Sequence, residues 1–132
     1  MKKVLLVLVL LSSFLFAGVK TVNATPEIVQ SGVKIIDIRT EQEWQQTGVI
    51  KDSILITFFD LHGNYDAQKF LDTISIYIKK GEEFALICRT GNRTTAVSDF
   101  LGKHGYDVIN LKGGVVRLMQ QGYTLKKYNK NK

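Results

Sequence analysis

The sequence predicts an α/β fold in which a parallel sheet carries helices on both of its faces. Short runs rich in β-branched residues alternate with segments whose apolar residues recur at helical spacing. This alternation is typical of strand–helix–strand units, whose crossover helices cover both faces of a parallel sheet. At 132 residues, the chain has room for a single core.

The first half of the predicted domain contains two helices and two strands. In "TPEIVQSG", Thr25 is the expected cap, Pro26 suits the first helical position and the glycine can end the helix. The β-branched run "VKIIDI" then predicts a buried strand. In "TEQEWQQTG", Thr40 and Glu43 form a capping box, and "SILI" after it is a second strand. These four elements would cover residues 25–32, 33–38, 40–48 and 53–56.

The second half repeats this alternation. Apolar residues recur on one helical face from 66 to 80 and again from 93 to 104. The runs "EFALIC" (83–88) and "YDVINL" (106–111) predict a third and a fourth strand. "GGVVRLMQQGY" begins with flexible turns and becomes a last short helix.

The first 17 residues are expected to lie outside this domain. Two lysines precede an apolar run at 4–17 that is shorter than the roughly 20 residues of a membrane span. We therefore expect a secretory signal peptide, cleaved after Ala17 or alternatively after Ala24, although an uncleaved anchor stays open. The mature domain, 18–132, would be periplasmic or secreted, with no membrane attachment after cleavage.

The net charge of +6 is scattered along the chain, apart from a basic C-terminal tail at 125–132. We expect the core to span about 25–124 and the tail to be solvated. This distribution does not predict nucleic-acid binding, which requires clustered basic residues. The surplus positive charge instead favours small anionic substrates through electrostatic steering.

The chain contains one cysteine, Cys88, at the carboxyl end of the third predicted strand. A single cysteine in an exported protein cannot close an internal disulfide, so it is either a small buried hydrophobe or a working thiol. Ligands of parallel sheets bind beyond the carboxyl ends of the strands. The position of Cys88 therefore favours a functional thiol.

The segment "CRTGNRT" supplies what a reactive thiolate needs. Amides at the start of the next helix lack internal partners, and the helix dipole adds positive charge there. Gly91 allows successive amides to curl around an anion, and Arg89 and Arg93 add two full charges. We expect Cys88 to be ionised at neutral pH, to act as the nucleophile and to hold an anionic covalent intermediate.

The residues expected to bind the substrate follow the cysteine directly. They are Arg89, Thr90, Gly91, Asn92, Arg93 and Thr94. Thr94 and Thr95 could either cap the helix or donate a hydroxyl toward the sulfur, and the sequence leaves both roles open.

Other kinds of site are disfavoured. His62 falls in a predicted turn and His104 near a predicted helix end, which argues against a Cys–His protease. One cysteine and two separated histidines do not form a zinc site. The sequence contains no glycine motif for nucleotide phosphates or dinucleotides.

Three blocks of the sequence resemble the rhodanese family of sulfurtransferases in its single-domain form. "IDIRTEQEWQQTGVI" is similar to the family's aspartate-x-arginine segment, and "CRTGNRT" matches its active-site loop. "LKGGVVRLMQQGY" resembles the closing double-glycine segment and last helix, so that the blocks span residues 36–123. The departures from the family pattern lie outside the loop, at Val49, Asp52, Ser53, Leu118 and Thr124.

The resemblance implies a five-stranded parallel sheet and a sulfur-carrying cysteine. Cys88 would take a sulfane sulfur from thiosulfate or a similar anionic donor and become a persulfide. The sulfur would pass to cyanide, another thiophilic acceptor or an acceptor protein, with no metal or organic cofactor. Asp37 and Arg39 would be scaffold residues, with Arg39 paired to an acidic residue such as Glu43.

Two other functions stay open, a non-enzymatic persulfide carrier or binding module and a phosphatase-like hydrolase. The loop from Cys88 to Arg93 contains six residues, which is the sulfurtransferase length. Related phosphatases and arsenate reductases have a loop one residue longer, which makes room for a tetrahedral oxyanion. The loop length therefore favours sulfur over phosphate, while the oligomeric state is not predicted.

Overall fold

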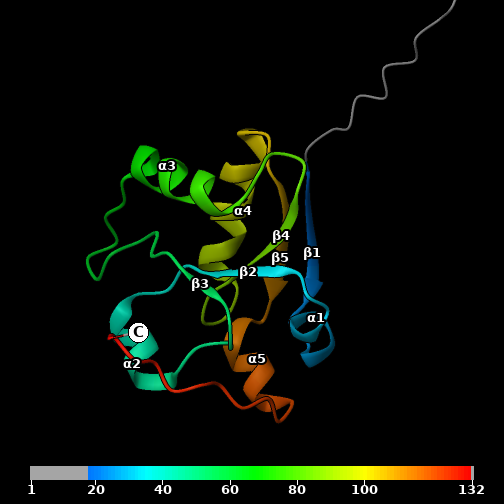
Figure 1. Ribbon diagram of the computed structural model, residues 1–132, viewed down its shortest axis with the longest axis vertical. Helices are drawn as coiled ribbons and strands as arrows, with labels where there is room; N and C mark the ends of the chain where they lie inside the picture. Colours follow the sequence, from blue (N-terminus) through cyan, green and yellow to red (C-terminus); the bar gives the residue numbers. More distant parts are fainter. Residues whose placement is uncertain (1–17, 132) are drawn as a thin grey trace, which may run out of the picture.

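The computed structural model describes residues 18–131, in which five parallel strands form one sheet with the order β1-β5-β4-β2-β3 (Figure 1). The strands are β1 (Val19–Asn23), β2 (Lys34–Asp37), β3 (Ile54–Leu55), β4 (Glu83–Ile87) and β5 (Asp107–Lys112). The predicted parallel α/β fold is confirmed, and β4 lies at the centre of the sheet. The predicted signal peptide, residues 1–17, lies outside the described residues.

Five helices connect or follow the strands. They are α1 (Pro26–Gln30), α2 (Glu41–Thr47), α3 (Ala67–Tyr77), α4 (Asn92–Lys103) and α5 (Gly114–Gln120). The predicted capping box is present, since the Thr40 side chain accepts from the Glu43 amide and the Glu43 side chain accepts from the Thr40 amide. Thr25 caps α1, and Pro26 occupies its first turn as expected. Within residues 18–131, no helix is long and apolar enough to cross a membrane.

Alternate residues of β4 face two different hydrophobic clusters. Phe84 and Leu86 pack in the cluster formed with α3 and α4, whereas Ala85 and Ile87 pack in the one formed with α1 and α5. All four side chains are completely buried. Helices therefore cover both faces of the sheet, and Cys88 continues the alternation into the cluster of α3 and α4.

One strand was not predicted from the residue pattern. β1 pairs with β5 along its full length, from Val19 opposite Val108 to Asn23 opposite Lys112. It is an edge strand with mostly exposed side chains, so the segment "VKTVN" lacks the apolar run of a buried strand. The sheet thus begins before residue 25, where the core was expected to start.

In the basic tail expected at 125–132, the side chains of Lys126, Lys127 and Lys130 are exposed, as expected, but the backbone also turns back onto the domain. Val49 and Lys126 exchange two backbone hydrogen bonds of 2.8 Å in an antiparallel bridge. Leu125 packs against the cluster of α1 and α5. The segment therefore continues the packed structure beyond residue 124.

Candidate active site

Cys88 follows β4 directly and lies at the carboxyl edge, in the middle of the sheet. Its side chain is only 1% exposed, so the thiol sits at the base of the loop that follows. The backbone N–H of Gly91 donates to Cys88 Sγ at 3.2 Å, and Thr94 Oγ1 lies 3.6 Å from the same atom. The structure therefore brings a backbone amide and a hydroxyl from the predicted loop to the sulfur.

Gly91 shapes this loop because it adopts a φ of +99° and lies against another turn of the chain. A Cβ at this position would lie 3.1 Å from the backbone nitrogen of Gly113. Gly91 is also the N-cap of α4, and no side chain caps that helix. No capping side chain therefore occupies the first amides of α4, and these amides can donate hydrogen bonds to an anion.

The start of α5 holds the other side of the loop. The Val115 amide donates to the carbonyl of Cys88 at 3.0 Å, and the Val116 amide donates to that of Arg89 at 3.1 Å. Gly114 has a φ of +59°, and a Cβ there would overlap these same two carbonyl oxygens. The α5 amides thus bind the carbonyl groups of the loop, which leaves its N–H groups for the sulfur.

Arg93 makes a bidentate ion pair with Glu43 of α2. Its two terminal nitrogens donate to the two carboxylate oxygens at 2.6 and 2.7 Å. Burial alone would raise the pKa of Glu43, but the hydrogen bonds and charge of Arg93, helped by the Thr40 amide and the Arg39 charge, leave that pKa below its usual value. Arg93 is therefore a charge held in place rather than a free one.

The carboxylate acts on Arg93 in the opposite sense. The hydrogen bond from Arg93 to Glu43 raises the pKa of Arg93, against a smaller lowering by burial, and the charge of Cys88 adds to the rise. Arg93, the last residue of the six-residue loop that begins at Cys88, thus carries a positive charge whose hydrogen bonds go to Glu43.

Arg39 is paired with an acidic residue, as expected, but that residue is Asp37 and not Glu43. Arg39 is completely buried and pairs with Asp37, to which its Nη2 donates at 2.8 Å and its Nε at 3.0 Å. Its remaining donors reach Thr47 Oγ1 at 2.7 Å and the Gly48 carbonyl at 2.8 Å. Asp37, only two residues before Arg39, satisfies the guanidinium from the end of β2, and Glu43 is left for Arg93. Arg39 thereby ties β2 to the end of α2.

The other loop side chains line the rim. Arg89, Thr90 and Asn92 are exposed, and within residues 18–131 their side chains make no hydrogen bond or ion pair. The two loop arginines therefore differ, because Arg89 is available to an incoming anion whereas Arg93 is already paired.

Thr94 and Thr95 both fix the loop, although neither is the N-cap. Thr94 is completely buried and donates its hydroxyl to the Gly91 carbonyl at 3.1 Å. Thr95 donates to the same carbonyl at 2.8 Å and accepts from Asn110 Nδ2 at 3.1 Å. Of the two, Thr94 is the hydroxyl that lies near the sulfur.

A polar hollow of about 350 Å³ adjoins one side of the loop. It extends toward the edge of the sheet formed by β1 and β5. Its lining consists of hydroxyl, amide and ammonium side chains together with loop backbone, from Thr21, Thr90, Gly91, Asn92, Thr95, Asn110 and Lys112. Lys112 adds an exposed positive charge to this side of the site.

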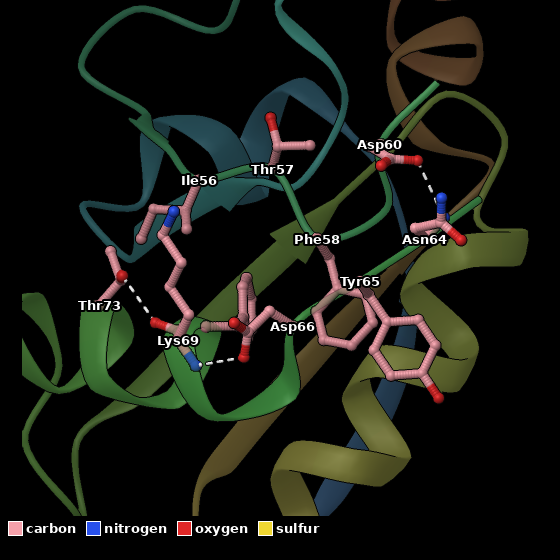
Figure 2. Close-up of a pocket in the computed structure, with 10 residues that line it drawn as sticks. Ile56, Thr57, Phe58, Asp60, Asn64, Tyr65, Asp66, Lys69 and Thr73 are labelled. Atoms are coloured by element: carbon pink, nitrogen blue, oxygen red, sulfur yellow. Dashed lines mark hydrogen bonds between the residues drawn. The ribbon is translucent and has the colours of Figure 1, made fainter. Parts of the chain in front are cut away.

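Aromatic side chains lie on the other side. A hollow of about 580 Å³ lies between the segment after β3 and the start of α3. Figure 2 shows the rings of Phe58 and Tyr65 side by side in its lining. These rings stack at 5.1 Å, and both also line a hollow of about 170 Å³ against α4. Phe58 packs in the same cluster as Cys88. No residue of the Cys88 loop lines the larger hollow, so this hollow does not contain the site.

Two site features were missed in the sequence. The Glu43 carboxylate was assigned to the wrong arginine, and the amides of α5 were not connected to the loop. The double glycine before α5 was the available signal, because consecutive glycines ahead of a helix indicate a close backbone approach. His104 is the C-cap of α4, at the opposite end of that helix from the loop, which agrees with its predicted place near a helix end.

Known proteins share the sequence pattern and the fold of this domain. A family model described as "Rhodanese-like domain" matches residues 23–121. The chain is 23% identical over 109 residues to Rhodanese-like domain-containing protein 17 of Arabidopsis thaliana, covering 80% of this chain and 70% of that protein. It spans 65 to 70% of the length of the curated relatives that it matches.

Solved structures show the same fold. A rhodanese-related protein from Thermoplasma volcanium aligns with a TM-score of 0.62 at 20% identity, covering 80% of this chain and 98% of that one. A rhodanese-like domain protein from Staphylococcus aureus aligns with a TM-score of 0.59 at 22% identity, covering 81% and 98%. At such identities the likeness concerns the arrangement of strands and helices.

Proposed function

Because the chain belongs to the rhodanese-like domain family, we propose that it is a sulfurtransferase in which Cys88 carries sulfur as a persulfide. The observation that carries the proposal is the hydrogen bond of 3.2 Å from the Gly91 amide to Cys88 Sγ. An amide aimed at a buried sulfur stabilises negative charge there, both on the thiolate and on its sulfur adduct. The match to the rhodanese-like domain family supports a sulfurtransferase-type function at the level of the family.

The proposed first step uses an anionic sulfane-sulfur donor such as thiosulfate. Exposed Arg89 attracts the donor, and the Cys88 thiolate attacks its outer sulfur. The sulfur–sulfur bond of the donor breaks, and sulfite leaves with the bonding electron pair. The product is a persulfide anion on Cys88, next to the Gly91 amide and the Thr94 hydroxyl.

The second step returns the enzyme to its starting state. A thiophilic nucleophile such as cyanide attacks the terminal sulfur of the persulfide, and the Cys88 thiolate is the leaving group. No net oxidation or reduction of the enzyme occurs over the cycle. The low exposure of Cys88 keeps bulk water from solvating the anion, which strengthens its interaction with the amide.

Loop size supports sulfur rather than phosphate as the transferred group. The ring of backbone from Cys88 to Arg93 holds six residues, and the Gly91 amide already lies within hydrogen-bond distance of Sγ. A phosphoryl group would need its oxygens accommodated as well as the sulfur. The α5 amides and Gly113 pack against the outside of the loop, which resists such a widening.

The test is sulfur transfer from thiosulfate to cyanide, combined with intact-mass measurement after treatment with the donor. We expect the wild-type protein to gain one sulfur atom and to release thiocyanate, and the Cys88→Ser variant to do neither. A persulfide that forms but does not turn over would instead indicate a carrier that needs a partner protein. Phosphate release from a chromogenic ester that Cys88→Ser abolishes would overturn the assignment to sulfur chemistry.

We also propose that the protein is exported and cleaved after Ala17. Cleavage there would leave β1 whole, whereas cleavage after Ala24 would remove β1 and its pairing with β5. The backbone N–H of Gly18, the resulting first residue, donates a hydrogen bond to Asp107 Oδ1 at 3.1 Å. The mass of the protein recovered from outside the cytoplasm tests this, and a mature chain beginning at Thr25 would contradict it.

A further inference from the structure

Residues 125–130, here called the clamp, lie beyond the family match and pack across α2. Lys126 holds the clamp to the chain just after α2, through two backbone hydrogen bonds of 2.8 Å with Val49. The approach is close, since a Cβ at Gly48 would lie 2.5 Å from the Lys126 carbonyl oxygen. The clamp is therefore fitted to the end of α2 by backbone contacts.

The side chains of the clamp contact the body of α2. The ring of Tyr128 lies 5.6 Å from that of Trp44, the one buried residue of the helix. The Tyr128 hydroxyl donates to Glu41 Oε1 at 3.3 Å, and Lys130 Nζ lies 3.3 Å from the same oxygen. The clamp thus contacts the first turn, the middle and the end of a seven-residue helix.

α2 needs such support because it is short and buries little of itself. Isolated helices of this length are unstable in water, so tertiary contacts must hold them. Arg39 supplies one set of contacts at Thr47 and Gly48, and the clamp supplies another. The same helix carries Glu43, which holds Arg93 beside the Cys88 loop.

We propose that the clamp is a positioning element for sulfur transfer, which keeps α2 where Glu43 can hold and partly neutralise Arg93. The role in sulfur transfer rests on the proposed function, whereas the effect of the clamp on the local charge around Cys88 does not. When Tyr128 is removed, α2 loosens and Glu43 leaves Arg93. The uncompensated guanidinium then makes the surroundings of the sulfur more positive.

Alkylation of Cys88 measures that charge directly. Iodoacetate is anionic and iodoacetamide is neutral, so the ratio of their rate constants reports the local potential at the thiolate. We expect Tyr128→Ala, which changes no charge itself, to raise this ratio roughly two- to threefold. Tyr128→Phe keeps the ring on Trp44 and should restore the wild-type ratio.

A double-mutant cycle separates positioning from a general loss of stability. Glu43→Gln should raise the ratio by itself, and Tyr128→Ala should add nothing further in that background. Asn129→Ala is the matched control, because Asn129 lies in the clamp, carries no charge and, within residues 18–131, accepts with its side chain only from the Asn131 amide, at 3.5 Å. It should leave the ratio within the experimental error.

The single tryptophan of the chain, Trp44, shows whether the clamp has been released. Its fluorescence emission should shift to longer wavelength in Tyr128→Ala, because the indole loses its cover. A red shift with an unchanged alkylation ratio, or equal effects of Tyr128→Ala with and without Glu43, would overturn the proposal. Alkylation needs no sulfur donor, so failure of the clamp and failure of persulfide formation are observed separately.

Discussion

Arg93 and Glu43 form a two-point ion pair, at 2.6 and 2.7 Å, between residues 50 positions apart in the sequence. The pair joins the first turn of α4 to α2 and thereby fixes one side of the Cys88 loop. Both side chains are partly buried and the contact is bidentate, which makes the pair stronger than an exposed salt bridge. Two consequences for reactivity and stability can be measured.

Replacing Arg93 should slow the chemistry of Cys88. Arg93→Ala removes the positive charge near the sulfur and leaves the Glu43 carboxylate without its partner. We expect alkylation by iodoacetamide at neutral pH and kcat/KM for thiosulfate each to fall about tenfold, which corresponds to about 1.4 kcal/mol. Adding Glu43→Gln should recover part of the loss, and an unchanged pH profile of alkylation would contradict this account.

The ion pair should also make stability depend on pH. The pKa of Glu43 is lowered in the folded protein from a usual value of 4.5. The ion pair therefore contributes fully to the free energy of unfolding above pH 4.5, and this contribution is lost as the pH falls through the lowered pKa of the folded state. We expect Glu43→Gln to reduce the free energy of unfolding by about 1 kcal/mol near neutral pH and by little near pH 3. Urea denaturation at both pH values measures this, and the pH dependence of the difference should shrink or reverse when Arg93→Met is added, because burial then raises the pKa of Glu43.

Gly114 should tolerate no side chain. Gly114→Ala would drive a Cβ into the carbonyl oxygens of Cys88 and Arg89 and separate α5 from the loop. Gly122 is the matched control, because its φ is also positive, at +84°, yet no atom lies within 4 Å of a Cβ built there. We expect Gly122→Ala to cost about 1 kcal/mol and to keep activity, whereas Gly114→Ala costs about 3 kcal/mol and loses persulfide formation. Equal losses of activity in the two variants would show that backbone strain, rather than the contact with the loop, is responsible.

The buried pair of Asp37 and Arg39 should dominate the stability of the scaffold. Asp37→Ala leaves a completely buried guanidinium without its carboxylate, and we expect it to cost about 3–5 kcal/mol in urea denaturation. The exposed pair of Lys20 and Glu83 provides a contrast, since Glu83→Ala should change the free energy of unfolding by less than about 1 kcal/mol. Similar costs for the two variants would refute the assigned role of burial.

The sequence was sufficient for features that depend on neighbouring residues. The capping box of Thr40 and Glu43, the buried run of β4 and the place of Cys88 at a strand end are all local patterns, and the structure contains each of them. Helix α4 was predicted within a residue of its bounds because its apolar face is regular. Such patterns reflect the period of a helix or strand and do not require knowledge of distant contacts.

Long-range contacts were beyond the reach of those patterns. β1 carries few buried side chains at an edge of the sheet, so its segment looks like a polar linker. The choice of Arg93 over Arg39 by Glu43 depends on how α2 and α4 meet, which no spacing within either helix reveals. The docking of residues 125–130 onto α2 likewise joins segments about 80 positions apart, and a run of lysines gives no sign of it.

The direction of the strands separates the two ends of the domain. β1 begins at Val19, at the amino edge of the sheet, whereas Cys88 follows β4 at the opposite, carboxyl edge. Five residues of extended chain place these edges about 16 Å apart. An affinity tag or surface attachment placed before Gly18 would therefore hold the protein by the edge of the sheet remote from the sulfur. The Cys88 loop would then face the solution, which suits binding and reactivity measurements on immobilised protein.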